Sequence, residues 1–90
     1  MDKCFLCGKN GYSDPLDTHH IFGGPYRKKS ERYGLTVKLC HHSCHIFGLH
    51  SVHQDAEMAQ RLREYGQRKW MAEQDKTVDD FRREFGRNYL

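Results

Sequence analysis

Two adjacent histidines, His19 and His20, lie between a short polar segment and the pair Gly23 and Gly24. If residues 18–22 are extended, successive side chains point to opposite faces, so the two imidazole rings cannot face the same way. One ring could then bind a metal ion while the other reaches a neighbouring group. Both roles need partner residues from elsewhere in the chain.

Four cysteines form a second group with metal-binding spacing. Cys4 and Cys7 form a Cys-x2-Cys pair closed by Gly8, a residue that accepts the positive φ of such a turn. Cys40 and Cys44 form a Cys-x3-Cys pair. Four thiolates suit a closed tetrahedral zinc site, and zinc binding would contribute folding free energy. Two disulfides or free buried thiols are the alternative.

The composition indicates why such a site would matter. The chain has 90 residues, of which 37% are hydrophobic, and a domain of this size buries only a modest core. It contains no signal peptide and no apolar run long enough to span a membrane, which predicts a soluble cytoplasmic protein with no membrane partner. In a reducing compartment, paired cysteines are more often metal ligands than disulfides.

The net charge of +3 is unevenly distributed along the chain. Residues 1–53 carry seven Lys/Arg and four Asp/Glu, whereas residues 54–90 carry eight of each. The excess positive charge therefore lies in the part that holds the cysteines, which is compatible with a polyanionic partner.

Short strands are expected to position both groups. Residues 16–22 predict one strand, ended by Gly23-Gly24-Pro25. The apolar–polar alternation over residues 35–39 predicts a second strand, which runs directly into Cys40. Residues 25–33 are basic and polar without a clear period, which indicates a loop or an irregular helix.

Two helices are expected in the C-terminal part. Ser51 and Gln54 fit a capping box, at N-cap and N3, of a helix that runs to about Ala72. Its apolar positions at helical spacing, which predict core packing, are Met58, Leu62, Tyr65 and Trp70. A last short helix is expected between a cap at Thr77 and a stop at Gly86. Its i, i+4 pair is Phe81 and Phe85.

The order of these features resembles the HNH endonucleases, which are His-Me finger (ββα-metal) nucleases. The resemblance covers residues 4–53. It is carried by Cys4-x2-Cys7, His19-His20-Ile21, Leu39-Cys40-x3-Cys44-His45 and the histidine that follows. The longer run from His19 to Gly24, the segment 27–35 and the ending from Phe85 to Leu90 are similar to small phage-encoded HNH proteins.

The resemblance implies an α+β fold. A zinc-stapled ββα-metal (treble-clef-like) core would cover residues 1–53, and a C-terminal helical extension over residues 54–90 would pack on it within a single domain. The implied activity is hydrolysis of phosphodiester bonds in DNA, with double-stranded DNA as the first candidate. Zinc would be structural, and a second divalent metal, Mg²⁺ or another, would be catalytic. The host cytoplasm is the implied location, with other phage proteins or a second copy of the chain as further partners.

The resemblance also implies roles for single residues. The first histidine of the pair, His19, would bind the catalytic metal, and the second, His20, would act as general base on the attacking water. Further metal ligands would come from the helix of the motif, with His45 as the first candidate, His53 the second and His50 the third. The residues that would contact backbone phosphates are Arg27, Lys28, Lys29 and Arg32.

The sequence departs from the family pattern in two places. An Asn usually precedes the second strand and steadies the loop that carries the base, but Leu35 stands there. The candidate substitutes are Ser30, Tyr33 and Thr36. The second cysteine pair has three intervening residues rather than two, which makes His41 a further candidate ligand beside His45 if residues 41–45 are helical.

Two other classes of function stay open. One is a non-catalytic zinc module that binds nucleic acid or protein with a degenerate HNH motif. The other is a structural zinc protein whose C-terminal helices dock a partner. The histidine pair favours the nuclease, because a binding module has no need of His19 and His20 beside further histidine ligands.

Overall fold

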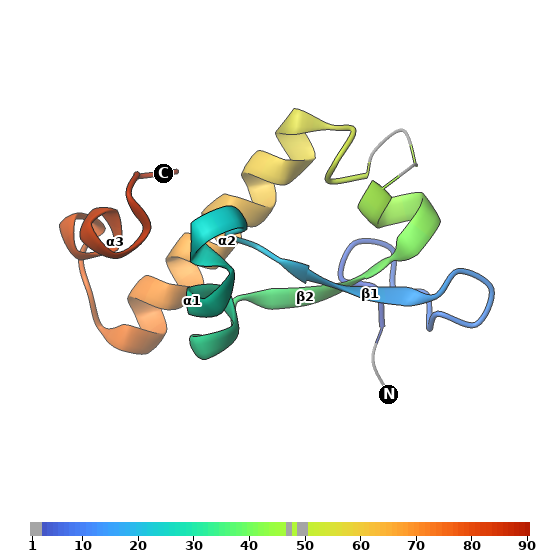
Figure 1. Ribbon diagram of the computed structural model, residues 1–90, viewed down its shortest axis with the longest axis horizontal. Coiled ribbons are helices and arrows are strands. Elements are labelled where there is room, and N and C mark those ends of the chain that lie inside the picture. The colour runs from blue at the N-terminus through green and yellow to red at the C-terminus, as the bar shows by residue number, and fades with distance from the viewer. Residues whose placement is uncertain (1–2, 47, 49–50) are drawn as a thin grey trace. The chain divides into compact units, whose positions relative to one another are not determined.

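The fold is α+β, with a two-stranded sheet and helices (Figure 1). The computed structural model describes residues 3–46, 48 and 51–90. Its elements, in chain order, are β1 (Leu16–His20), the 3₁₀ helix η1 (Gly24–Tyr26), α1 (Arg27–Arg32), β2 (Thr36–Cys40), the π-helix η2 (His41–Ile46), α2 (Ala56–Gln74) and α3 (Val78–Phe85). Among these described helices, none has the length and apolar character needed to cross a membrane.

The chain divides into two compact units. Unit 1 comprises Met1–His19 and Thr36–Ala59, and unit 2 comprises His20–Leu35 and Gln60–Leu90. Each unit therefore joins segments that are distant in sequence. The domain boundary expected between residues 53 and 54 stays a prediction.

β1 and β2 pair with antiparallel register. The Ile21 N–H donates to the Leu35 carbonyl (3.0 Å) beyond one end of the pair, and the His41 N–H donates to the Pro15 carbonyl (2.7 Å) beyond the other. Both predicted strands are confirmed, although β1 already ends at His20. The basic segment between the strands forms η1 and α1, so the irregular helix is the correct alternative there.

The start of η2 is held by Asp14, a residue of the loop before β1. Asp14 Oδ1 accepts a hydrogen bond from the His42 N–H (2.8 Å) and Oδ2 accepts one from the Ser43 N–H (2.9 Å). These bonds lower the pKa of the Asp14 carboxyl. On the far side of η2, the Val52 N–H donates to the Cys44 carbonyl (2.9 Å). Hydrogen bonds from both sides thus fix the turn that carries Cys44.

α2 begins at Ala56, so the capping box predicted at Ser51 and Gln54 is wrong. The cap is Asp55, whose Oδ1 accepts a hydrogen bond from the Met58 N–H (3.2 Å). The Ser51 carbonyl instead accepts the N–H groups of Gln54 (3.1 Å) and Asp55 (2.8 Å) in a tight turn. Aspartate and serine are equally good N-caps, so the sequence offers two candidate caps for this helix, Ser51 and Asp55. Because Ser51 forms a turn, the helix begins after Asp55.

Unit 2 has an aromatic core. The ring centroid of Phe22 lies 5.3 Å from that of Phe81 and 4.8 Å from that of Phe85. Trp70, the only tryptophan of the chain, has its ring centroid 5.6 Å from that of Phe81. All four side chains are buried, so edge and tilted ring contacts add to the hydrophobic burial.

The core positions predicted on α2 are confirmed at Leu62 and Trp70 and wrong at Tyr65, which is 38% exposed. The fully buried residue near it is Gln67. Its Oε1 accepts a hydrogen bond from the Tyr89 N–H (2.7 Å), so the amide is satisfied inside unit 2. A polar residue therefore occupies a position that hydrophobicity alone would not select.

α3 has the predicted termini. Thr77 is its N-cap and forms a capping box with Asp80. Gly86 ends the helix with a φ of 82°, a left-handed conformation that favours glycine. The rings of Phe81 and Phe85 stack with centroids 4.7 Å apart, as their i, i+4 spacing predicts.

Candidate metal centre

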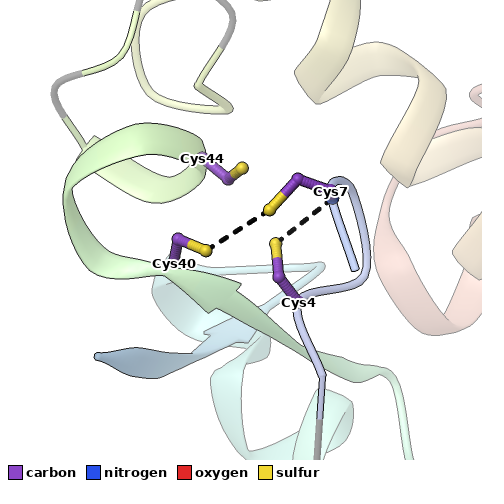
Figure 2. A group of neighbouring side chains, drawn as sticks. All are labelled: Cys4, Cys7, Cys40 and Cys44. Carbon is purple, nitrogen blue, oxygen red and sulfur yellow. Dashed lines mark hydrogen bonds between the residues drawn. The ribbon is translucent and has the colours of Figure 1, made fainter. Parts of the chain in front are cut away.

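The four cysteine side chains converge from three segments of unit 1 (Figure 2). Cys4 and Cys7 lie in the N-terminal turn, Cys40 ends β2 and Cys44 lies in η2. Their sulfur atoms all lie within 4.8 Å of one another, and Cys7 Sγ is 3.4 Å from Cys40 Sγ. Tetrahedral zinc with Zn–S bonds of about 2.3 Å needs sulfurs about 3.8 Å apart. The four cysteines, all of which are free of disulfides, could therefore hold a metal such as zinc.

Backbone hydrogen bonds hold the N-terminal turn against β2. The Phe5 N–H donates to the Lys38 carbonyl (2.8 Å), and the Gly8 N–H donates to the Cys4 carbonyl (2.9 Å). Gly8 has a φ of 78°, as the glycine-closed pair predicts. The Cys7 N–H donates to Cys4 Sγ (3.5 Å), an interaction that favours a thiolate at this sulfur.

Burial and hydrogen bonds shift the pKa values of the thiols in different directions. Burial opposes ionisation of Cys4, but backbone hydrogen bonds, chiefly that of Cys7, outweigh it and lower the pKa of Cys4 to about 6. Burial, together with hydrogen bonds to neighbouring thiols, raises the pKa of Cys40 to about 12 and also raises the pKa of Cys44. Ionisation of Cys4 is thus favoured, whereas ionisation of Cys40 and Cys44 is opposed. A divalent cation reverses that opposition, because metal-bound thiols are deprotonated.

Three histidines form a second cluster in unit 1. His19 comes from β1, His45 from η2 and His53 from the segment before α2, and one ring nitrogen of each lies within 4.8 Å of the others. The ring centroids are 4.7 Å apart for His45–His53, 5.2 Å for His19–His45 and 5.5 Å for His19–His53. The His53 N–H donates to the His45 carbonyl (3.2 Å), which keeps these two residues side by side.

The protonation state of the cluster suits a metal. Burial lowers the pKa of His53, and the repulsion that arises when both His53 and His45 are protonated lowers it further. His53 is therefore neutral at pH 7, the form whose ring nitrogen can donate a lone pair. The structure thus brings together the predicted ligands His19, His45 and His53 in a group that could hold a divalent metal.

Asp17 is a site residue that the sequence did not single out. Its Oδ2 accepts hydrogen bonds from His45 Nδ1 (2.9 Å) and from His41 Nδ1 (2.5 Å), and these bonds lower the pKa of Asp17. An ionised carboxylate only accepts, so His45 Nδ1 carries a proton and Nε2 keeps the lone pair, as in most metal-ligating histidines. The available signal was the strand period, because Asp17 and His19 share one face of β1.

His20, the predicted general base, follows His19 in β1 and belongs to unit 2. Its Nε2 lies 2.8 Å from Glu31 Oε1, and its side chain is 13% exposed. Glu31 lies on α1 within the basic run, where its charge gave no signal of this role. Beside it, the buried Ser30 hydroxyl donates to the Phe22 carbonyl (2.8 Å) and accepts from the Phe22 N–H (3.1 Å). Ser30, a predicted substitute for the missing Asn, thus bonds the backbone that follows β1.

The basic residues predicted to contact phosphates differ in their surroundings. The Lys29 ammonium donates to the Glu84 carbonyl (2.6 Å) and pairs with the Glu84 carboxylate (3.4 Å), so it is engaged within unit 2. The exposed members of the set are Arg27, Lys28 and Arg32. His50, the third candidate ligand, lies outside the described residues.

Comparison of the chain with protein-family models, with curated proteins and with solved structures finds no match. The functional inference therefore rests on the chemistry of the cysteine and histidine side chains. Four cysteine ligands close a tetrahedral site, as in structural zinc centres, whereas three histidines leave a coordination position for water or substrate. The two clusters of unit 1 thus suit different tasks.

Proposed function

We propose that the protein is a metal-dependent DNA endonuclease of the HNH type. The observation that carries the proposal is the cluster of His19, His45 and His53, whose ligand atoms lie within 4.8 Å of one another beside the hydrogen bond from His45 to Asp17. Three protein ligands with an open position are typical of a catalytic metal site. In this proposal the strands and η2 form a ββα-metal core, and the four cysteines hold its structural zinc.

The donor set favours a particular class of catalytic metal. Imidazole nitrogens suit Zn²⁺ and Ni²⁺, whereas Mg²⁺ prefers oxygen ligands and retains several waters. A transition-metal ion therefore fits the three-histidine cluster better than Mg²⁺ does. When bound, it would stabilise negative charge on the phosphoryl oxygens and on the leaving oxygen.

His20 would accept the proton of the attacking water. Because the Glu31 carboxylate accepts a hydrogen bond from Nε2, the neutral His20 ring keeps its lone pair on Nδ1. Alternation along β1 directs His20 and His19 to opposite faces of the strand, so one residue can serve as base and the other as ligand. The Ser30 hydroxyl supports this arrangement by clamping the chain just after β1.

DNA binding would use the exposed cations of α1. Arg27, Lys28 and Arg32 can neutralise backbone phosphates without reading the base sequence. Lys29 would contribute less, because Glu84 already engages its ammonium. Cleavage with little sequence preference and a strong dependence on salt is the expected behaviour.

The decisive experiment is a plasmid-cleavage assay of the zinc-loaded protein with Ni²⁺, Co²⁺, Mn²⁺ or Mg²⁺ added. His20→Ala is expected to reduce the cleavage rate by about 10²- to 10⁴-fold, because it removes general-base catalysis. Zinc content should stay unchanged, since His20 is not part of the cysteine cluster. His42→Ala is the matched control, because His42 is exposed and belongs to none of the three groups of possible metal ligands found in the described residues.

Two results would contradict the proposal in different ways. Full cleavage by His20→Ala would remove His20 as the base. DNA binding by the wild-type protein without cleavage under any of these metals would support a non-catalytic zinc module instead.

A further inference from the structure

We infer that Asp17, His41 and His45 form a second divalent-cation site, suited to Zn²⁺, that competes with the three-histidine cluster for His45. One oxygen or nitrogen atom from each of the three side chains lies within 4.8 Å of the others. Only the expected effect on cleavage rests on the proposed function, because the second site itself consists of three residues of unit 1.

The geometry of the second site is close to that of a bound ion. Asp17 Oδ2 lies 2.5 Å from His41 Nδ1 and 2.9 Å from His45 Nδ1, so two imidazole nitrogens converge on one carboxylate oxygen. Zinc bonds of about 2.0–2.2 Å to nitrogen and oxygen place tetrahedral ligands about 3.3–3.5 Å apart. For the two contacts to Asp17, an ion in place of the ring protons, which would move to the Nε2 atoms, would therefore require shifts of about 1 Å or less.

The three side chains can make this adjustment and admit an ion from solvent. The His41 side chain is 48% exposed and that of Asp17 is 32% exposed, whereas that of His45 is 15% exposed. Two imidazoles and one carboxylate match the ligand types of open zinc sites, with a remaining position for water. The carboxylate also gives this site a negative charge that the three-histidine cluster lacks.

His45 couples the two sites. Its Nδ1 faces Asp17, so its other nitrogen, Nε2, is the one that remains for the cluster with His19 and His53. A cation on Nδ1 removes the hydrogen bond that orients the ring and moves the ring proton to Nε2, which then has no lone pair for the first site. Both nitrogens can hold an ion at once only if the ring releases that remaining proton to solvent as an imidazolate, which costs free energy. Filling the second site should therefore weaken metal binding at the first, and high zinc should act as an inhibitor.

Metal binding tests the site without reference to nuclease activity. The full chain, with zinc already bound by its cysteines, is titrated with Co²⁺ by calorimetry and by visible absorption. The wild-type protein should take up two further ions in separate steps. His41→Gln should weaken one step by more than about tenfold, because losing a ligand costs at least as much as losing an outer partner. His53→Gln should weaken the other step.

The controls separate this inference from the proposed function. His42→Gln, an exposed neighbour of His41, should bind as the wild type does. If His53→Gln alone had no effect, the second site would stand and the catalytic metal site would fall. If His41→Gln left every step unchanged, or if His42→Gln weakened binding equally, the second site would be wrong.

The functional consequence is measured as zinc inhibition. Cleavage is followed at increasing Zn²⁺, and each variant is compared with its own rate without added zinc. The wild-type protein should lose activity as the second step fills, and His41→Gln should need at least about tenfold more zinc for the same fractional loss. Equal sensitivity of the two proteins would overturn the inferred coupling through His45.

Discussion

Units 1 and 2 are stabilised by different chemistry. In unit 1 the buried apolar side chains include three of the four cysteines, and the set is Cys4, Leu39, Cys40, Cys44 and Val52. In unit 2 the buried apolar side chains are aliphatic and aromatic, and the set is Ile21, Phe22, Leu35, Leu62, Trp70, Phe81 and Phe85. Unit 1 therefore buries thiols that could bind a metal, whereas unit 2 buries aliphatic and aromatic side chains.

This difference suggests how a chain of 90 residues can contain several groups that could hold a metal. A fully buried apolar side chain contributes about 1.5–3 kcal/mol, whereas zinc binding by a structural site contributes about 10–16 kcal/mol. Unit 1 can thus assign its interior to thiols if a cation is bound. Unit 2 is stabilised by the packing of aliphatic and aromatic side chains.

Removal of zinc is expected to have the largest effect on the difference in stability between the two units. A high-affinity chelator should unfold unit 1, because its buried thiols lose the ion that compensates their charge. Hydrogen exchange should show loss of protection at β2 and η2, while the fluorescence of Trp70 reports a retained unit 2. Ser43→Ala, an exposed change within η2, is the control and should leave the chelator sensitivity unaltered. Simultaneous loss of both signals would show that the units do not fold separately.

The converse perturbation removes a ring from unit 2. Phe81→Ala should lower the free energy of unfolding by about 3–5 kcal/mol, because Phe81 is fully buried between Phe22, Trp70 and Phe85. Urea unfolding followed by Trp70 fluorescence measures this change. Tyr12→Ala is the matched control, since Tyr12 is 95% exposed. Loss of bound zinc in Phe81→Ala under native conditions would contradict the separation of the two units.

Glu31 tests the role proposed for His20, its hydrogen-bond partner within unit 2. Glu31→Gln should lower kcat by about tenfold, a part of the 10²- to 10⁴-fold contribution of a general base, because the amide no longer fixes the His20 tautomer. Nitrogen-15 NMR of His20 should show loss of the form protonated at Nε2. Glu84→Gln is the control, because Glu84 pairs with Lys29 and not with His20. An unchanged tautomer in Glu31→Gln would contradict the positioning role.

The sequence predicts the ligands of both clusters more fully than it predicts the residues that orient them. Cysteine spacing and the histidine pair are local patterns, and their chemistry limits the roles that the residues can have. Asp17 and Glu31 act on partners that lie 28 and 11 positions away, so their contacts appear only when β1, η2 and α1 are in place. Asp55 is a smaller case of the same kind, since a turn at Ser51 decides which cap is used.

The smallest expected effect concerns the N-terminal cap of α3, within unit 2. Hydrogen bonds from the Thr77 N–H and hydroxyl lower the pKa of the Asp80 carboxyl below its ordinary value. A lowered folded-state pKa means that the ionised carboxylate stabilises the fold at every pH above the unfolded value. That stabilisation is lost as the pH falls through the lowered pKa.

Asp80→Asn should therefore be less stable than the wild type at pH 7, and the difference should disappear as the solution is acidified below the pKa of the folded carboxyl. Urea unfolding followed at Trp70 measures this in unit 2, whose core holds no cysteine ligands. Asp79→Asn removes an equal charge from the same turn without the capping bond and serves as the control. A difference between Asp80→Asn and wild type that persisted in acid would assign the effect to packing, because a carboxylate cap loses its advantage once it is protonated.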